Sequence, residues 1–254
     1  MLTAMRDPDR AKSAHRLALG RADGDAAYAH QVWELDTTKA DVMTAGGRKM
    51  ILGLIDRWSR RVCFLVANSE SAQAVRGLLL KAIMAWGVTP GTIVVDNGSG
   101  YVNATVKTAC ELLGIAHKAC PPGSPERKPF VERLFGTFTR ERLVMMEGFT
   151  GHNVALAQQL RARARKTTGR AEITGTMEPD RLQVILDNWV TGTYETRRHS
   201  GIGMAPLARA MASPYAPTPA PAEAVLRQAL TAYVGTLVVG KRGLRWKNGR
   251  YWCA

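Results

Sequence analysis

The sequence of 254 residues is poor in the features that mark secreted, disulfide-rich and membrane-spanning proteins. Its four cysteines form no C-x-x-C pair, and its five histidines do not fall into ligand spacing with them. This pattern excludes a disulfide framework and a cysteine–histidine zinc site. No apolar run approaches the length needed to cross a bilayer, and no signal-peptide pattern opens the chain. We therefore expect a soluble protein inside the cell, with reduced cysteines.

Acidic residues are scarce relative to basic ones. The chain has 35 Lys and Arg against 21 Asp and Glu, a formal net charge of +14 and a pI near 10.1. Such an excess indicates a polyanionic partner. Nucleic acid is the commonest one for a basic globular chain, and an acidic membrane is the competing one. The length and the 46% hydrophobic content fit one large domain with a real core, plus a small domain.

Three carboxylates stand at the ends of apolar segments or on a helical one. Asp96 directly follows the β-branched run 92–95 and precedes Asn-Gly-Ser, which predicts a strand that ends in a carboxylate. Asp36 ends the short apolar segment in VWELDTT in the same way. Glu132 lies in KPFVERLFGTF, whose apolar residues recur with helical spacing and leave Glu132 off the apolar stripe.

The spacing of these carboxylates carries a resemblance. Residues 97–131, thirty-five in number, separate Asp96 from Glu132. Two strand-end aspartates followed at this distance by a helical glutamate resemble the D,D-35-E pattern of retroviral integrases and of many bacterial and phage transposases. Asp-Asn-Gly-Ser after the strand and Lys-Pro-x-x-Glu before the helix match the same pattern. Taken singly, an aspartate at a strand end is more often a turn former or a helix cap, but the complete set favours a catalytic core.

The resemblance implies that Asp36, Asp96 and Glu132 are both catalytic residues and metal ligands. Phosphodiester transfer requires charge to be stabilised on the attacking and the leaving oxygen, which two divalent ions roughly 3.5–4 Å apart achieve. Mg²⁺ prefers hard oxygen ligands and keeps several waters, so a few carboxylates suffice. We expect two Mg²⁺ or Mn²⁺ ions per site, with Asp36 bridging them and Asp96 and Glu132 binding one each.

Two further carboxylates, Asp56 and Glu34, are alternative candidates for the site. Asp56 ends the segment LID before RWSR, and we expect it to serve a turn or to pair with Arg57 or Arg60. Glu34 precedes Asp36 by two positions and shares its face in a regular strand. It is a weak candidate for an auxiliary contact.

The pattern along the chain predicts an α/β fold. Strands are expected at 31–36, 49–56, 61–67, 92–95 and 115–119, and helices at 71–86, 104–113, from about 129, at 155–166 and at 177–194. This order resembles the ribonuclease H-like fold, a five-stranded mixed sheet flanked by helices. In that fold the first and fourth strands are neighbours, so Asp36 and Asp96 would meet at one edge of the sheet.

The sequence pattern divides the whole chain into four expected parts. We expect a linker or flexible arm at 1–29, the catalytic domain at 30–210, a Pro/Ala-rich linker at 211–222 and a small all-β segment at 223–254. Asn248-Gly249 between basic and aromatic residues is a strong hairpin signal. The last segment resembles the opening half of the small β-barrel that follows the core in phage Mu transposase, with a DNA-binding role.

Basic residues near these elements are the expected DNA contacts. The helix at 155–166 has no acidic residue within it, which favours a DNA-backbone track over an ordinary solvated face. The segment YETRRHSGIGMAP resembles one that follows the core of many transposases, where His199 has either a phosphate-binding or a structural role. The expected contacts are Lys128, Arg133, Arg140, Arg161, Arg165, Arg197, Arg198, Lys241, Arg245 and Lys247.

Together these features resemble the core of a Mu-type transposase from a phage, prophage or related bacterial element. The resemblance implies nicking at the 3′ end of the element followed by strand transfer into target DNA, in the cytoplasm of a bacterial host at its nucleoid. It also implies a homo-oligomer on paired DNA ends and a target-delivering ATPase. Residues 1–29 are too short for an end-recognition domain, so we expect a fragment or a chain without that module. Two alternatives remain: a metal-dependent nuclease of the same fold, and a catalytically silent DNA-binding relative.

Overall fold

The computed structural model describes residues 26–120, 129–169, 173–231, 239–240, 243–246 and 249–251. The predicted arm at 1–29 therefore lies almost wholly outside the described residues, as do Lys128, Lys241 and Lys247. Within this part of the chain, no helix is long and apolar enough to cross a membrane.

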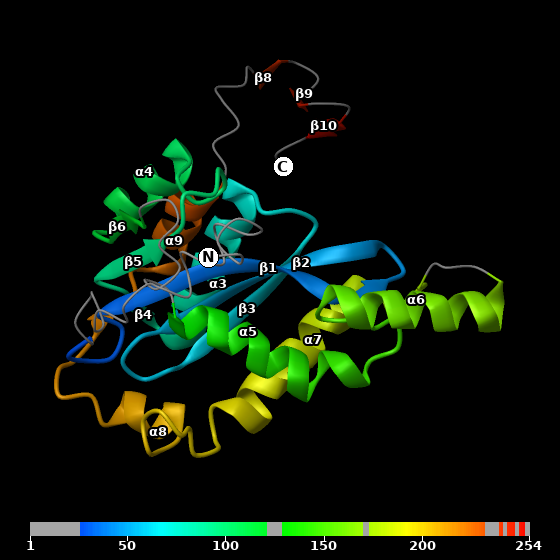
Figure 1. The fold of residues 1–254 in the computed structure, drawn as a ribbon. Helices are drawn as coiled ribbons and strands as arrows, with labels where there is room; N and C mark the ends of the chain where they lie inside the picture. Colours follow the sequence, from blue (N-terminus) through cyan, green and yellow to red (C-terminus); the bar gives the residue numbers. More distant parts are fainter. Residues whose placement is uncertain are drawn as a thin grey trace, which may run out of the picture.

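The centre of the fold is the predicted five-stranded mixed sheet (Figure 1). Its strands are β1 (Val32–Thr44), β2 (Gly47–Asp56), β3 (Val62–Ala67), β5 (Thr92–Val95) and β6 (Ala116–Ala119), in the order β3-β2-β1-β5-β6. The first three strands form an antiparallel meander, whereas β5 runs parallel to both β1 and β6. The predicted neighbours β1 and β5 are thus confirmed.

Strand β1 is longer than its sequence indicated, with 13 residues instead of the predicted six. Polar residues at 37–39 interrupt the apolar pattern, but they continue the pairing with β2 as far as Lys39, opposite Met50. The register shifts between Lys39 and Met43, and the hairpin closes with Thr44 opposite Gly47.

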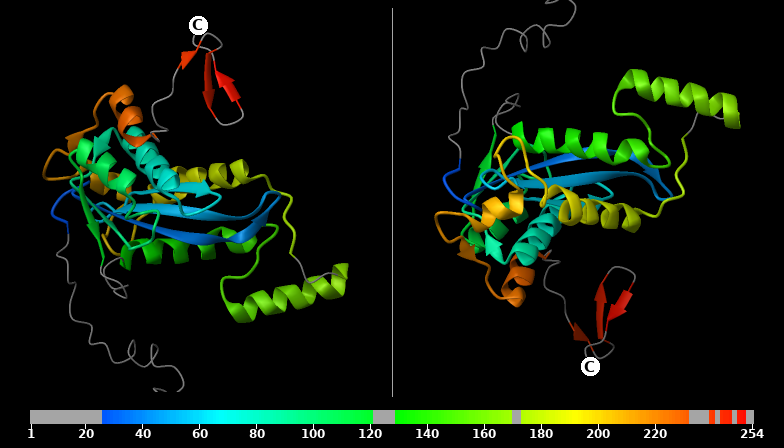
Figure 2. Two further views of the ribbon diagram at one scale, coloured as in Figure 1. Left: turned by 90° about the horizontal axis from the view of Figure 1, so that it is seen from above. Right: turned by 90° about the horizontal axis from the view of Figure 1, so that it is seen from below.

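Helices cover both faces of the sheet (Figures 1 and 2). On one face, α3 (Ala72–Trp86), α4 (Ala104–Leu112) and α9 (Glu223–Leu230) share a core with Trp33 and Leu35. On the other face, α5 (Pro129–Glu141) packs with α7 (Pro179–Trp189) against residues such as Ile51 and Phe64. Successive residues of a strand point to opposite faces, so β1 contributes to both cores.

Several ends of these helices follow the predicted signals. Ser71 caps α3 by accepting a hydrogen bond from the Ala74 amide at 3.2 Å, and Gly87 ends the helix with a φ of 67°. Asn103 caps α4 by accepting a hydrogen bond from the Thr105 amide at 2.9 Å. Pro129 opens α5, where its missing N–H costs nothing.

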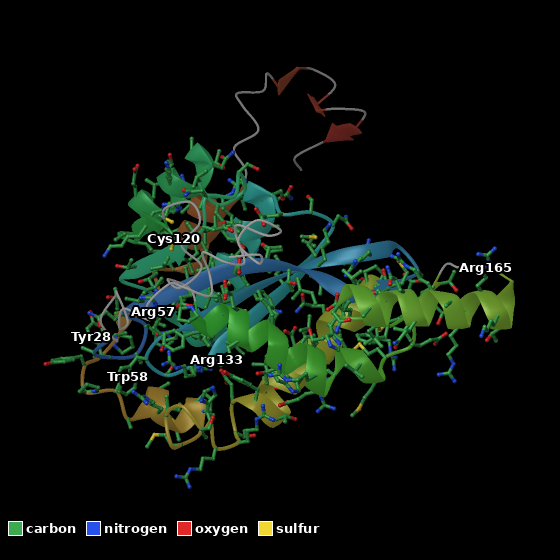
Figure 3. All side chains as sticks on the ribbon, in the orientation of Figure 1. Tyr28, Arg57, Trp58, Cys120, Arg133 and Arg165 are labelled. Carbon is green, nitrogen blue, oxygen red and sulfur yellow. The ribbon has the colours of Figure 1, made fainter. Side chains whose placement is uncertain are left out.

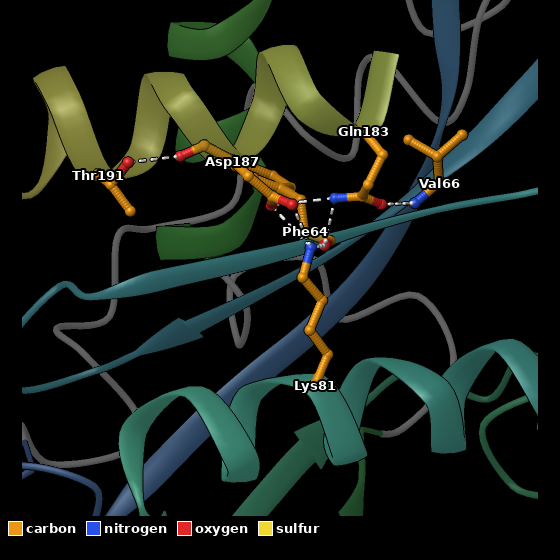
Figure 4. Close-up of polar contacts among 6 residues, drawn as sticks. All are labelled: Phe64, Val66, Lys81, Gln183, Asp187 and Thr191. Carbon is orange, nitrogen blue, oxygen red and sulfur yellow. Dashed lines mark hydrogen bonds and ion pairs between the residues drawn. The ribbon is translucent and has the colours of Figure 1, made fainter. Parts of the chain in front are cut away.

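The outer edge of the sheet is protected by side chains from α7 (Figure 4). The Val66 amide of β3 donates to Gln183 Oε1 at 2.8 Å, and Gln183 Nε2 donates to the Phe64 carbonyl at 3.1 Å. Lys81 of α3 also donates to the Phe64 carbonyl, at 2.8 Å, and pairs with Asp187 at 2.7 Å. An edge strand whose backbone groups are satisfied in this way does not recruit another strand.

The segment expected as a linker and the start of the expected β segment both pack on the core. After α8 (Pro206–Met211), β7 (Thr218–Pro219) pairs with β4 (Val88–Thr89). The assignment of 223–230 to a small all-β segment is wrong, because these residues form α9. Leu226 and Leu230, one turn apart, are buried in the core beside α3 and α4.

The predicted C-terminal hairpin is confirmed. Strand β9 (Gly243–Trp246) pairs antiparallel with β10 (Gly249–Tyr251), and β8 (Val239–Gly240) completes a separate three-stranded sheet. The division of the chain into domains stays a prediction.

Three cysteines match the expectation of reduced core residues. Cys63, Cys110 and Cys120 are buried and form no disulfide with one another. Burial raises the pKa of the Cys63 and Cys110 thiols to about 12, so both stay protonated and unreactive near neutral pH.

The connection from α5 to α7 contains a 3₁₀ turn (Leu143–Met145) and helix α6 (Val154–Thr168). A π-helical turn (Val190–Tyr194) extends α7 at its C-terminal end. Helix α6 projects away from the sheet in all three views (Figures 1 and 2).

Candidate active site

The parallel pairing of β1 and β5 places two of the predicted carboxylates side by side. Glu34 is paired with Val94; Asp36 follows two positions later on β1, and Asp96 follows two positions after Val94, directly after the end of β5. Because parallel strands advance together, the two aspartates reach the same level at the carboxyl end of β5. Both are partly exposed. The topology thus brings together residues that are 60 positions apart, while their catalytic role stays a prediction.

The orientation of Asp96 is fixed by its own turn. Asp96 Oδ1 accepts a hydrogen bond from the Gly98 amide at 3.0 Å, which is an aspartate-type turn. A Cβ at Gly98 would overlap Glu70 Oε1 and lie 3.0 Å from Asp96 Oδ1. The two carboxylates therefore lie close to the backbone of Gly98, and a side chain there would displace that of Glu70.

Glu70 and Tyr101 also belong to this neighbourhood, although neither was among the site residues expected from the sequence. Tyr101 is fully buried, and its hydroxyl shares a 2.6 Å hydrogen bond with Thr37 Oγ1 of β1. Burial raises the pKa of Tyr101 well above its usual value, and the negative charges of Asp36, Glu70 and Asp96 raise it further. Tyr101 thus ties β1 to the turn after β5 and stays neutral beside these carboxylates. Its position five residues after Asp96 was the available signal.

Glu132 lies exposed in the first turn of α5, as the helical pattern predicted. Among the described residues, however, no group of three or more histidine, cysteine, aspartate or glutamate side chains is arranged to hold a metal ion. The structure therefore brings Asp36 and Asp96 together but does not complete the triad with Glu132.

The adjacent aspartates fit a divalent cation by their chemistry. Carboxylate oxygens are the hard ligands that Mg²⁺ prefers, and this ion is commonly held by one or two carboxylates together with water and substrate phosphates. Asp36 and Asp96 provide two such groups, partly exposed to solvent. The donor set of this pair fits one ion; the second ion depends on Glu132.

The two rival carboxylates have other partners. Asp56 is buried and accepts hydrogen bonds from the His30 amide at 3.0 Å, the Ser59 amide at 3.0 Å and the Ser59 hydroxyl. Burial raises its pKa, against these hydrogen bonds. The predicted turn role of Asp56 is confirmed, because it closes the turn between β2 and β3.

Glu34 is fully buried and contacts helix α5. It accepts from Arg57 Nε at 2.7 Å and from the Phe130 and Val131 amides at 3.2 Å each. Burial raises the pKa of Glu34, while Arg57 and the two amides lower it.

The part of the chain that carries the aspartate pair is similar to known proteins. Residues 26–125, which contain Asp36 and Asp96, match the integrase core domain family. This part of the chain belongs to the integrase/transposase superfamily. The integrase core family is a divalent-metal-dependent family of polynucleotidyl transferases, which agrees with the fit of the aspartate pair.

A retroviral polyprotein is similar in sequence to part of this chain. The Gag-Pol polyprotein of avian reticuloendotheliosis virus is 32% identical over 139 residues, which cover 54% of this chain and 12% of the polyprotein. The chain thus corresponds to a small part of that relative's length.

Among solved structures, a chain of the simian T-cell lymphotropic virus intasome in complex with PP2A regulatory subunit B56 gamma aligns with a TM-score of 0.55 and 18% identity. The alignment covers 82% of this chain and 64% of that one, and it confirms the ribonuclease H-like fold. The HTLV-2 integrase catalytic core domain in complex with magnesium aligns with a TM-score of 0.47 and 15% identity, over 71% of this chain and 95% of that one.

The described basic residues that were predicted to contact DNA fall into four groups along the chain. Arg133 and Arg140 are exposed on α5, and Arg161 and Arg165 are exposed on α6. Arg165 lies toward the end of α6 that projects from the body (Figure 3). Arg245 belongs to β9, whose side chains lie outside the described ones.

Arg197 and Arg198 follow the π-helical turn and are both exposed. Arg197 pairs with Glu141 at 2.7 Å, so part of its charge is already neutralised. His199 Nδ1 accepts from the Gly201 amide at 3.1 Å. Burial and the nearby Arg60, Arg197 and Arg133 lower the pKa of His199, so it is neutral and holds its own loop. The structural alternative for His199 is therefore supported.

A groove of about 720 Å³ separates α6 from the hairpin of β1 and β2. Arg48 and Arg161 line it from opposite sides. Arg48 pairs with Asp41 at 2.7 Å, whereas α6 contains no acidic residue. The wall contributed by α6 is thus the more positive one.

Proposed function

We propose that this protein is a DNA transposase that carries out metal-dependent nicking of 3′ ends and strand transfer for a mobile element. The observation that carries the proposal is the register of Asp36 and Asp96 at a partly exposed edge of the integrase core. Asp36 and Asp96 would hold a divalent cation, which stabilises the charge on the attacking and leaving oxygens of a phosphodiester. Glu132 would complete the site for a second ion.

The protein's own side chains would position the DNA. The formal charge of +14 attracts the phosphate backbone, and the exposed arginines of α5 and α6 provide contacts near and beyond the aspartate pair. The turn that holds Asp96 and the hydrogen bond between Thr37 and Tyr101 fix the two strands that carry the carboxylates. Preorganised groups of this kind avoid reorganisation during the reaction.

The proposal includes the finer expectations from the sequence. The Mu-like C-terminal pattern supports a phage or bacterial element, although the relatives described above are retroviral. On that basis we propose action at the nucleoid of a bacterial cell, as a homo-oligomer on paired DNA ends. A target-delivering ATPase partner rests on the transposase resemblance alone.

The test is nicking and joining of labelled and supercoiled DNA in Mg²⁺ or Mn²⁺. Asp36→Asn, Asp96→Asn and Glu132→Gln should abolish both products while leaving folding and plain DNA binding nearly intact. Asp41→Asn is the matched control, since Asp41 lies on the same strand and pairs with Arg48 at 2.7 Å. Loss of joining in the control as well would contradict the assignment.

A second candidate is a catalytically silent DNA-binding relative. It is favoured by the lack of a three-carboxylate metal group within the described ranges, which omit 121–128 directly before α5. Salt-sensitive DNA binding without nicking or joining by the parent protein would establish this candidate. Nicks without joined products would instead indicate a nuclease of the same fold.

A further inference from the structure

The start of helix α5 is held by a buried carboxylate from a distant strand. Glu34 of β1 has no exposed surface, and Arg57 is 6% exposed. One carboxylate oxygen of Glu34 accepts from Arg57 Nε at 2.7 Å, and the other accepts from the amides of Phe130 and Val131 at 3.2 Å. The first amides of a helix have no partner within it and form its positive end. Glu34 therefore acts as the cap of α5.

A second contact holds the same turn from the side. The guanidinium carbon of Arg60 lies 3.4 Å from the ring centre of Phe130, and Arg60 donates to the carbonyl of Arg57. Arg57 and Arg60 belong to the turn between β2 and β3, which Asp56 closes. Phe130 is thus fixed at its amide by Glu34 and at its ring by Arg60.

These contacts set both the position and the rotation of Glu132. Glu132 directly follows Val131, and each helical residue adds 1.5 Å of rise and a turn of about 100°. A slip of one residue at the start of α5 would therefore point the Glu132 side chain in a different direction. Asp36 lies two residues after Glu34 on β1 and on the same face of the sheet. Strand β1 thus carries the predicted metal ligand Asp36 and also Glu34, which anchors the helix that carries the predicted ligand Glu132.

The chemistry of the pair argues for a specific role. A buried ion pair stabilises a protein little, or not at all, relative to apolar side chains of similar volume. A buried pair whose carboxylate also accepts two helix amides instead selects one placement of that helix.

We propose that Glu34, held by Arg57, is a positioning residue that fixes the start of α5, and with it the point on the helix from which Glu132 joins Asp36 and Asp96 when a divalent ion is bound. This inference rests on the proposed function. Partners that orient metal ligands from outside the coordination shell typically change metal affinity or activity about 10- to 100-fold when they are replaced.

The test replaces the pair by apolar side chains of similar size, Glu34→Met with Arg57→Met, so that no unpaired charge remains buried. The matched control is Arg61→Met with Glu195→Met, another largely buried pair, with contacts of 2.8 and 3.1 Å. The readouts are Mn²⁺ affinity by electron paramagnetic resonance, kcat and KM for DNA nicking, and the thermal unfolding midpoint.

The Glu34/Arg57 variant should lose about 10- to 100-fold in Mn²⁺ affinity and in kcat, with an unchanged KM for DNA, whereas the control should keep all three. In a Glu132→Gln background the same replacement should cause no further loss of Mn²⁺ affinity, because Glu34 acts through Glu132. Glu34→Gln, which keeps an oxygen acceptor for the helix amides, should lose less than the double replacement.

Two results would overturn the inference. Equal losses in the variant and the control, or losses that add fully to those of Glu132→Gln, would show a general effect on stability while leaving the proposed function in place. A parent protein that neither binds Mn²⁺ nor nicks DNA would overturn the proposed function and this inference with it.

Discussion

A single methyl group at Gly53 should disturb both the stability of the sheet and the seating of α5. Gly53 of β2 lies directly opposite Asp36 of β1. A Cβ at this position would stand 2.8 Å from two ring atoms of Phe135 and 3.2 Å from the ring of Phe64. Since carbon atoms do not approach to 2.8 Å, the Phe135 ring has to move, and we expect this to displace α5, which carries the ring.

The magnitude follows from two opposing effects. Overpacking of a filled core costs about 1–3 kcal/mol. Replacing glycine by alanine within a strand gains about 0.5–1 kcal/mol, because less chain entropy is lost on folding. We therefore expect Gly53→Ala to lower the free energy of unfolding by up to about 2.5 kcal/mol, and to lower DNA nicking as α5 shifts.

A double-mutant cycle with Phe135→Leu tests the cause. Leucine lacks the ring atoms that meet the new methyl group, so Gly53→Ala should become neutral or stabilising in that background. The two changes should couple by about 1 kcal/mol or more in urea unfolding. The control is Gly192→Ala, where a Cβ meets nothing within 4 Å. If Gly53→Ala destabilises equally with and without the Phe135 ring, contact with α5 is not the reason and the argument fails.

Three other predictions concern separate features. Burial, together with the nearby Arg61, lowers the pKa of His30 from 6.5 to about 4. As the pH falls from 6.5 toward 4, the unfolded chain therefore binds a proton at His30 before the native protein does, and the free energy of unfolding decreases. At pH 5 this loss amounts to about 2 kcal/mol, and it should vanish in His30→Asn, which tolerates the φ of 65°; urea midpoints between pH 4 and 8 check this. Replacing Arg161 and Arg165 together by glutamine should weaken DNA binding and reduce the slope of log K against log salt by up to about 2, whereas an unchanged slope would mean that α6 does not touch DNA. Gln183→Leu removes two side-chain hydrogen bonds to the edge strand β3 and should cost about 1–3 kcal/mol and promote dimers or aggregates; a purely monomeric, equally stable variant in ultracentrifugation and urea unfolding would contradict the edge-protecting role.

Much of the fold was predictable because its signals are local. Apolar alternation defined four of the five sheet strands to within two residues, and Ser71, Asn103 and Pro129 marked helix starts. The extension of β1 was missed because residues 37–39 are polar and their strand conformation comes from pairing with β2. The α9 helix had a usable signal in Leu226 and Leu230, four positions apart, which the Pro/Ala-rich stretch before it obscured.

Some features of the candidate site were also predictable from the sequence, and others were not. The adjacency of Asp36 and Asp96 followed from strand order, which a resemblance in spacing is able to predict. The contacts of Glu34 with α5 were not predictable, because its partners there are backbone amides 96 and 97 positions away, and backbone amides have no sequence signature. The approach of Glu70 to Asp96 depends on the turn around Gly98, and a turn's exact path is likewise set by tertiary contacts.

Glu34 and Asp36 lie on the same face of β1 but differ in their exposure to solvent. Glu34 is fully buried, with Arg57 and two helix amides around it, so its charge is compensated within the fold. Asp36 is partly exposed, and the glycine opposite it adds no side chain that would cover it. Its negative charge, next to that of Asp96, repels a phosphate group, whereas the positive charge of the chain as a whole attracts DNA. DNA and a cation bound between these aspartates would therefore favour each other's binding, by the same factor in both directions.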